Sequence, residues 1–203
     1  MRTLLATILW LAIAVNGAFA QNAIVTENQL VGTPQSQWDL SGPGSTTLQG
    51  FTTDISVNHG STVNFKIQAS TNRWRIDIYR LGYYQGNGAR LITTINKTSA
   101  QSQPSPVINS ATGEVDAGDW AVTASWAVPA SAVSGVYIAH LVDQTNTSNE
   151  NHIPFIVRAD ESTSDVLFQT SDTTWQAYNG WGGANLYGAT ALAGIPLRAA
   201  PIR

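Results

Sequence analysis

The 203-residue sequence predicts a mainly β protein, in which an antiparallel β-sandwich is followed by the incomplete start of an α/β domain. Short alternating runs, separated by turn residues, extend from Ile24 to Val157, and this is the pattern of all-β domains. After Val157 a polar stretch leads into an apolar segment without alternation. Such a segment is typical of a strand buried on both faces of an α/β sheet.

The composition agrees with an exported β protein and excludes several other classes. Charged residues make up 11% of the chain, below the usual ~25%, whereas 43% of the residues are apolar. The chain is therefore too apolar to be disordered, and its 10 Lys and Arg residues are too few for a nucleic-acid partner. Because there is no Cys, disulfide scaffolds, thiolate zinc sites and cysteine nucleophiles are excluded.

Residues 1–20 predict a cleaved secretory signal peptide. One positive charge at Arg2 precedes an apolar run at 4–15, and Ala-Phe-Ala at 18–20 is a small-x-small cleavage site. The apolar run makes ~18 Å of helix, too short for a ~30 Å hydrocarbon core. We therefore expect a secreted or periplasmic product that begins at Gln21 and has no membrane span.

Residues 21–158 are expected to form an immunoglobulin- or fibronectin-like sandwich. In the clearest strand Val63, Phe65 and Ile67 alternate with polar side chains. Inward-facing Trp residues on other strands are typical of such sandwiches. A different antiparallel fold, such as a small jelly roll, remains the alternative. The expected strands are 51–57, 62–69, 73–81, 89–95, 119–128, 136–143 and 153–157.

The sequence after the sandwich predicts a linker at 159–164 and an incomplete α/β domain at 165–203. The apolar run 165–169 is the expected strand. Thr173 and Gln176 then fit a capping box, so a helix is expected to begin there and to end at the glycines that follow. A segment of some 40 residues is too short for a stable α/β core, because a typical domain has roughly 100–150 residues.

Six motifs of the chain are informative as an ordered set. The most specific is the run 165–179, which ends in TWQAYN. The others are RIDIYRLGYY at 75–84, GAR at 88–90, WAVTASW at 120–126, SGVY at 134–137 and HIPF at 152–155. Over about residues 50–188 the chain thereby resembles the large (beta) subunit of N,N-dimethylformamidase and its relatives. In that family an immunoglobulin-like domain precedes a glutamine-amidotransferase-like α/β domain.

The resemblance implies a metal-dependent amide hydrolase, in which two tyrosinates and a glutamate hold iron. Tyr178 lies where the first Tyr ligand of the family is expected, and it is the candidate metal ligand here. A hard ferric ion favours oxygen ligands, and its charge promotes loss of the phenol proton. The alternative is that Tyr178 has a structural role, as an aromatic side chain that packs at the end of a helix.

The resemblance also places the second Tyr and the Glu beyond Arg203. We therefore expect a non-catalytic N-terminal fragment that has no complete active site and no cofactor of its own. Iron is expected in a full-length relative. The expected partner is the remainder of the α/β domain or a second subunit.

Tyr83 and Tyr84 suggest a different function. Flanked by glycines, they form a candidate exposed aromatic platform for a glycan or a protein partner, and a plug that packs the hairpin end is the alternative. This reading makes the chain a secreted binding or adhesion module.

The remaining polar candidates are weaker. His59, His140 and His152 are scattered without the spacing of metal ligands, and we interpret them as hydrogen-bonded structural residues. Asp116 and Asp119 flank one turn, but two carboxylates alone make a poor calcium site.

Overall fold

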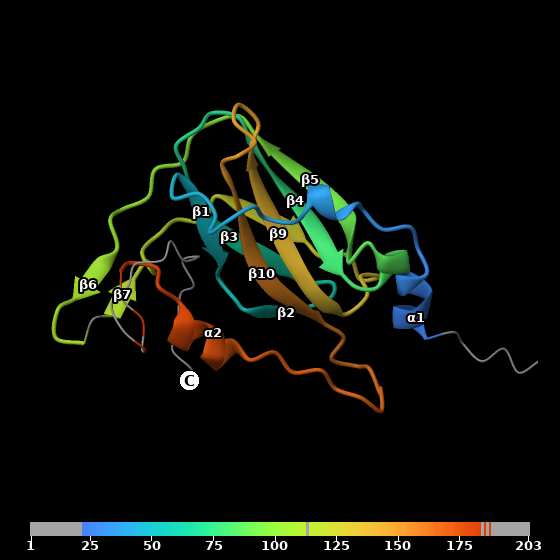
Figure 1. Cartoon of the computed structure of the whole chain (residues 1–203). Helices are drawn as coiled ribbons and strands as arrows, with labels where there is room; N and C mark the ends of the chain where they lie inside the picture. Colours follow the sequence, from blue (N-terminus) through green and yellow to red (C-terminus); the bar gives the residue numbers. More distant parts are fainter. Residues whose placement is uncertain (1–21, 113, 184, 186, 188–203) are drawn as a thin grey trace, which may run out of the picture.

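The computed structural model describes residues 22–112, 114–183, 185 and 187 (Figure 1). The predicted signal peptide at 1–20 and the tail at 188–203 lie outside the described residues. Of the described helices, none is long and apolar enough to cross a membrane.

Two sheets form a sandwich, and a small hairpin lies to one side of it (Figure 1). The three-stranded sheet has the order β1 (Leu48–Thr52), β3 (Thr62–Ala69), β8 (Ala124–Ala127). The five-stranded sheet has the order β2 (Ser56–Asn58), β10 (Glu150–Arg158), β9 (Gly135–Asp143), β4 (Trp74–Leu81), β5 (Ala89–Lys97). All pairs are antiparallel except β2 with β10. The hairpin consists of β6 (Val107–Asn109) and β7 (Glu114–Asp116).

Alternation along the strands builds the core between the two sheets. Val63, Phe65 and Ile67 of β3 are fully buried, as the sequence predicts. Phe155 of β10 lies across from them and contacts the Phe65 ring edge-on at 5.8 Å between centroids. Burying a side chain of this size contributes about 1.5–3 kcal/mol. The prediction of a mainly β sandwich is confirmed.

Two of the expected strands differ from the structure. The single strand expected at 51–57 is wrong, because the chain crosses between the sheets there: Phe51 belongs to β1, and Ser56 begins β2. Of the strand expected at 119–128, only Ala124–Ala127 pairs with β3. Trp120 lies outside the sheet and packs on Phe51 in a second, smaller cluster. Its apolar side chain therefore fits the alternation of a strand in the sequence, although it is buried elsewhere.

A helix near the start of the described residues has no counterpart among the elements predicted from the sequence. Helix α1 (Ala23–Asn28) lies beside the short 3-10 helix η2 (Tyr84–Gly86) at one end of the sandwich. Asn22 caps α1 by accepting a hydrogen bond from the Ile24 amide at 2.9 Å. Another 3-10 helix, η1 (Gln35–Gln37), follows α1 along the chain.

Beyond β10 the polar linker leads to helix α2 (Asp172–Tyr178). The helix and its end before Gly180 agree with prediction, but Ser171 rather than Thr173 occupies the cap position and makes no side-chain cap bond. The strand expected at 165–169 is wrong in this structure, since no strand within the described ranges pairs with it. Leu167 is accordingly 90% exposed.

Candidate functional site

Tyr178, the candidate metal ligand, lies at the end of α2. Its side chain is 62% exposed, and its ring stacks on Tyr187 with centroids 4.4 Å apart and an interplanar angle of 22°. Tyr187 was not singled out from the sequence, because nothing in its spacing indicates that the chain returns to the helix end.

The described residues around Tyr178 do not make a complete set of ligands for iron. A hard ferric ion takes several oxygen donors, and the two phenols stack face to face instead of converging. Over the described ranges, no group of three or more His, Asp or Glu side chains is placed to hold a metal ion. We therefore derive no chemical step through iron in this chain.

The segment that carries Tyr178 is attached to the sandwich through Trp181. Its indole Nε1 donates a hydrogen bond to Gln49 Oε1 at 3.1 Å. Its ring meets Trp120 edge-on, with centroids 6.0 Å apart. This contact fixes the chain just after α2 against the three-stranded sheet.

Tyr83 and Tyr84 do not form an exposed aromatic pair. Tyr83 is 70% exposed, but Tyr84 is completely buried. The cause is local: Tyr84 and Gln85 have φ angles of 41° and 58°, and this left-handed turn directs the second ring inward. The expectation of a two-ring platform is therefore corrected to one exposed ring.

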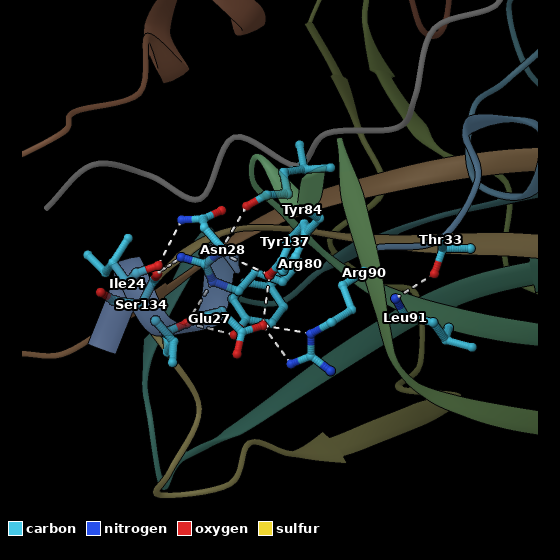
Figure 2. A network of polar contacts seen from close by, with 12 residues as sticks. Ile24, Glu27, Asn28, Thr33, Arg80, Tyr84, Arg90, Leu91, Ser134 and Tyr137 are labelled. Carbon is cyan, nitrogen blue, oxygen red and sulfur yellow. Dashed lines mark hydrogen bonds and ion pairs between the residues drawn. The ribbon is translucent and has the colours of Figure 1, made fainter. Parts of the chain in front are cut away.

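The buried Tyr84 belongs to a polar network that links α1 to the sheet (Figure 2). Its hydroxyl donates to Glu27 Oε1 at 2.8 Å and accepts from Arg80 Nη1 at 3.0 Å. Arg90 Nε donates to the same Glu27 oxygen at 2.8 Å. Burial raises the pKa of Tyr84, so the phenol keeps the proton that it donates.

A polar cavity of about 610 Å³ lies on the outer face of the five-stranded sheet. Its floor is a row of side chains at paired positions of neighbouring strands, Thr94 on β5, Asp77 on β4 and His140 on β9. His152 on β10 continues the row. The residues that line the cavity are Ser36, Gln37, Arg75, Asp77, Tyr79, Leu91, Thr94, His140, Val142, Thr147 and Glu150.

Asp77 is buried in this cavity, and both of its carboxylate oxygens accept hydrogen bonds. One carboxylate oxygen accepts a hydrogen bond from Arg75 Nε at 2.6 Å, and the other accepts from Thr94 Oγ1 at 2.6 Å. Beside it, Tyr79 donates to the Gln37 carbonyl at 3.2 Å. Burial, followed by the charge of Asp77, raises the pKa of Tyr79 to about 12, so this phenol is neutral at physiological pH.

The two histidines of the row lie in contact. Their rings meet edge-on, with centroids 5.0 Å apart. His152 donates from Nε2 to the Trp38 carbonyl at 2.6 Å, and burial, then nearby His140, lowers its pKa to about 4. His140 Nε2 lies 2.9 Å from Glu150 Oε2, whereas His140 Nδ1 is buried and has no hydrogen-bond partner among the described residues.

The interpretation of the histidines is confirmed in one respect and corrected in another. All three are hydrogen-bonded, His59 to Glu161 and the others as above. The interpretation of them as scattered is wrong, since His140 and His152 pair across β9 and β10. The turn between β9 and β10 fixes the register that pairs His140 with His152. Locating this turn at 144–149 in the sequence would therefore have predicted that the two histidines are neighbours.

A model of the family described as N,N-dimethylformamidase beta subunit-like, C-terminal, matches residues 75–202. None of the curated proteins compared matches the chain. The matched residues include all of β4 except Trp74, most of the polar cavity and the segment with Tyr178. Because the match covers more than half of the sequence, the chain belongs to the N,N-dimethylformamidase beta subunit-like family.

Proposed function

We propose that this chain supplies an exported, non-catalytic β-sandwich region to an amide hydrolase of the dimethylformamidase type. The observation that carries the proposal is the family match at residues 75–202, which spans part of the sandwich and the segment that holds Tyr178. The sandwich would thus support a catalytic region that follows it.

The contacts of Trp181 support this arrangement. Through Gln49 and Trp120, Trp181 ties the chain after α2 to the sandwich. Tyr178 precedes it by three residues, so the anchored segment holds this phenol near the surface of the sandwich. A rigid anchor of this kind is what a metal ligand needs in order to keep its position.

Tyr178 would then be one of several iron ligands, and the others would come from the remainder of the α/β domain or from a second subunit. The family description names a subunit, which agrees with assembly into a larger enzyme. One phenol cannot hold or tune a metal by itself, so the described residues alone are expected to be inactive.

The test is an assay of the purified chain, supplied with ferric iron, on N,N-dimethylformamide, with Tyr178→Phe as the control. We expect no hydrolysis above the level of the control. Hydrolysis by the wild-type chain that Tyr178→Phe abolishes would contradict the non-catalytic role. Export is checked separately by N-terminal sequencing of the secreted product, which is expected to begin at Gln21.

A second candidate function, that of a secreted binding or adhesion module for a glycan or protein partner, depends on an exposed aromatic surface. The exposed aromatic pair that first suggested such binding is reduced to Tyr83 alone.

A further inference from the structure

Tyr178 and Tyr187 form an exposed pair of stacked phenol rings. The ring centroids lie 4.4 Å apart at an interplanar angle of 22°, and the two residues are 62% and 69% exposed. Neither hydroxyl makes a hydrogen bond to any other residue that the structure describes. A reagent in solution can therefore reach both phenols of the pair.

The turn between the two tyrosines is held against the rest of the chain. Trp181 donates to Gln49 and packs on Trp120. The next residue, Gly182, has a φ of 87° and lies so close to β7 that a Cβ atom there would come within 2.6 Å of the Val115 side chain. This anchored turn returns the chain to the end of α2, where the two rings meet.

The other four tyrosines of the chain are placed differently. Tyr79, Tyr84 and Tyr137 are buried, and the hydroxyl of each donates a hydrogen bond. Tyr83 is exposed, but its ring contacts no other aromatic ring among the described residues. The sequence also has no Cys and no Met after Met1, so it lacks the sulfur side chains that oxidants otherwise attack.

Two neighbouring phenols can be joined by oxidation. A one-electron oxidant takes an electron from a tyrosine, the phenol proton goes to water, and a phenoxyl radical remains that shares its unpaired electron with the ortho carbons of the ring. Two such radicals form a carbon–carbon bond between ortho positions, and the hydrogen on each bonded carbon moves to the oxygen of the same ring. In sum, the pair loses two hydrogen atoms, and one molecule of hydrogen peroxide is reduced to two molecules of water.

The observed geometry favours this coupling within the pair. A ring carbon lies one carbon–carbon bond length from its centroid, so the ortho carbons of the two rings are separated by at most 4.4 Å plus two bond lengths. Both rings are exposed and have room to rotate into contact. Reactants held this close combine far more readily than reactants that must meet by diffusion. The bond should therefore form within one chain before it forms between two chains.

We propose that Tyr178 and Tyr187 are a modification site, at which a haem peroxidase and hydrogen peroxide join the two rings as dityrosine. The bond closes a covalent loop around Trp181 and, as a cross-link does, restricts the conformations open to the segment after α2. The sequence predicts export, and exported proteins work in oxidising compartments. The reaction needs no metal at Tyr178, so the inference does not depend on the proposed function.

The experiment treats the purified full chain, at low concentration and with EDTA to remove metal ions, with a haem peroxidase and hydrogen peroxide. We expect the blue fluorescence of dityrosine and a monomer that has lost two hydrogen atoms. Trypsin then releases the peptide 159–198, and hydroxylamine cleaves it between Asn179 and Gly180. In the cross-linked chain the two halves should remain joined, and mass spectrometry detects them as one species.

Three variants locate the bond. Tyr178→Phe and Tyr187→Phe each keep a ring that can stack but cannot form a phenoxyl radical. Both should lose the joined peptide and the fluorescence. Tyr83→Phe is the matched control, because it removes an exposed hydroxyl whose ring has no aromatic partner among the described residues, and it should give the wild-type yield.

The proposal is wrong if the wild-type halves separate after oxidation, or if either variant of the pair still gives the joined peptide. Covalent dimers that depend on Tyr83, formed in place of the bond within one chain, would contradict it as well. So would the addition of oxygen to Trp175, which is 41% exposed, without the loss of two hydrogen atoms from the pair.

Discussion

The imidazole of His152 is neutral at pH 7, because burial and nearby His140 lower its pKa from 6.5 to about 4. An unfolded chain would take up a proton near pH 6.5, so between pH 6.5 and 4 the unfolded state binds more protons. Stability should therefore fall as the pH drops through this window and become independent of this residue below it. We expect a loss of about 2 kcal/mol, since the side chain keeps some solvent contact.

Urea unfolding at several pH values checks this expectation. In His152→Gln the amide can still donate to the Trp38 carbonyl but cannot titrate, so the part of the slope due to His152 should vanish. Identical slopes for the two proteins between pH 6.5 and 4 would show that the folded pKa is not lowered.

Tyr84 and Tyr83 provide a matched pair of substitutions at neighbouring positions. Tyr84→Phe removes the hydroxyl that joins Arg80 to Glu27, both of which are buried, and should cost about 1–2 kcal/mol of stability. Tyr83→Phe alters an exposed ring and should change stability by less than about 0.5 kcal/mol. Thermal or urea unfolding measures both. Equal effects would indicate that the buried hydroxyl is not held as described.

The sequence could identify these tyrosines but not their different environments. Two adjacent Tyr residues between glycines suggest a turn, and a turn is what the chain forms. The left-handed φ of Tyr84 and the Glu27 carboxylate that receives its hydroxyl depend on a helix far away in the sequence. No local pattern contains that information.

At the scale of elements, the attachment of α1 depends on Glu27. This side chain accepts hydrogen bonds from Tyr84 and Arg90, which come from the η2 turn and from β5. Glu27→Gln keeps an acceptor but removes the negative charge that faces Arg90. We expect a loss of about 1–3 kcal/mol and faster hydrogen exchange of the α1 amides.

Val25→Ala is the control, because Val25 lies on the same helix but is about half exposed. Its effect on stability should be small. If Glu27→Gln leaves both the unfolding midpoint and the exchange of α1 unchanged, the helix is attached by other contacts.

Alternation predicted most of the strands but not their ends or their sheets. It located β3 and β4 closely, whereas the central strand β9 was located by an apolar run and is buried on both faces. It failed at 51–57 and at 119–123, where the chain leaves one sheet while still burying apolar side chains such as Trp120. The polar cavity was missed for a related reason: its residues come from four strands, and only the register between strands brings them together.

At the scale of the whole molecule, the sandwich and the segment that follows it differ in how they are held. Residues from both sheets of the sandwich share one continuous core. Residues 165–169, by contrast, contribute none of the backbone hydrogen bonds found among the described residues. The apolar sequence of this segment predicts a buried strand, whereas Val166, Leu167 and Phe168 are exposed in the structure.

This contrast predicts where a protease cuts first. Leu167 and Phe168 are 90% and 77% exposed in extended chain, so chymotrypsin should cleave the full chain beside them. The aromatic side chains of the core, such as Phe65 and Phe155, are buried in paired strands and should resist, because a protease needs several residues of unfolded backbone. Mass spectrometry should find a stable fragment that ends at 167 or 168. In a variant with Leu167→Ser and Phe168→Ser the same fragment should form much more slowly, whereas early cleavage within β3 or β10 would mean that the sandwich is not the stable unit.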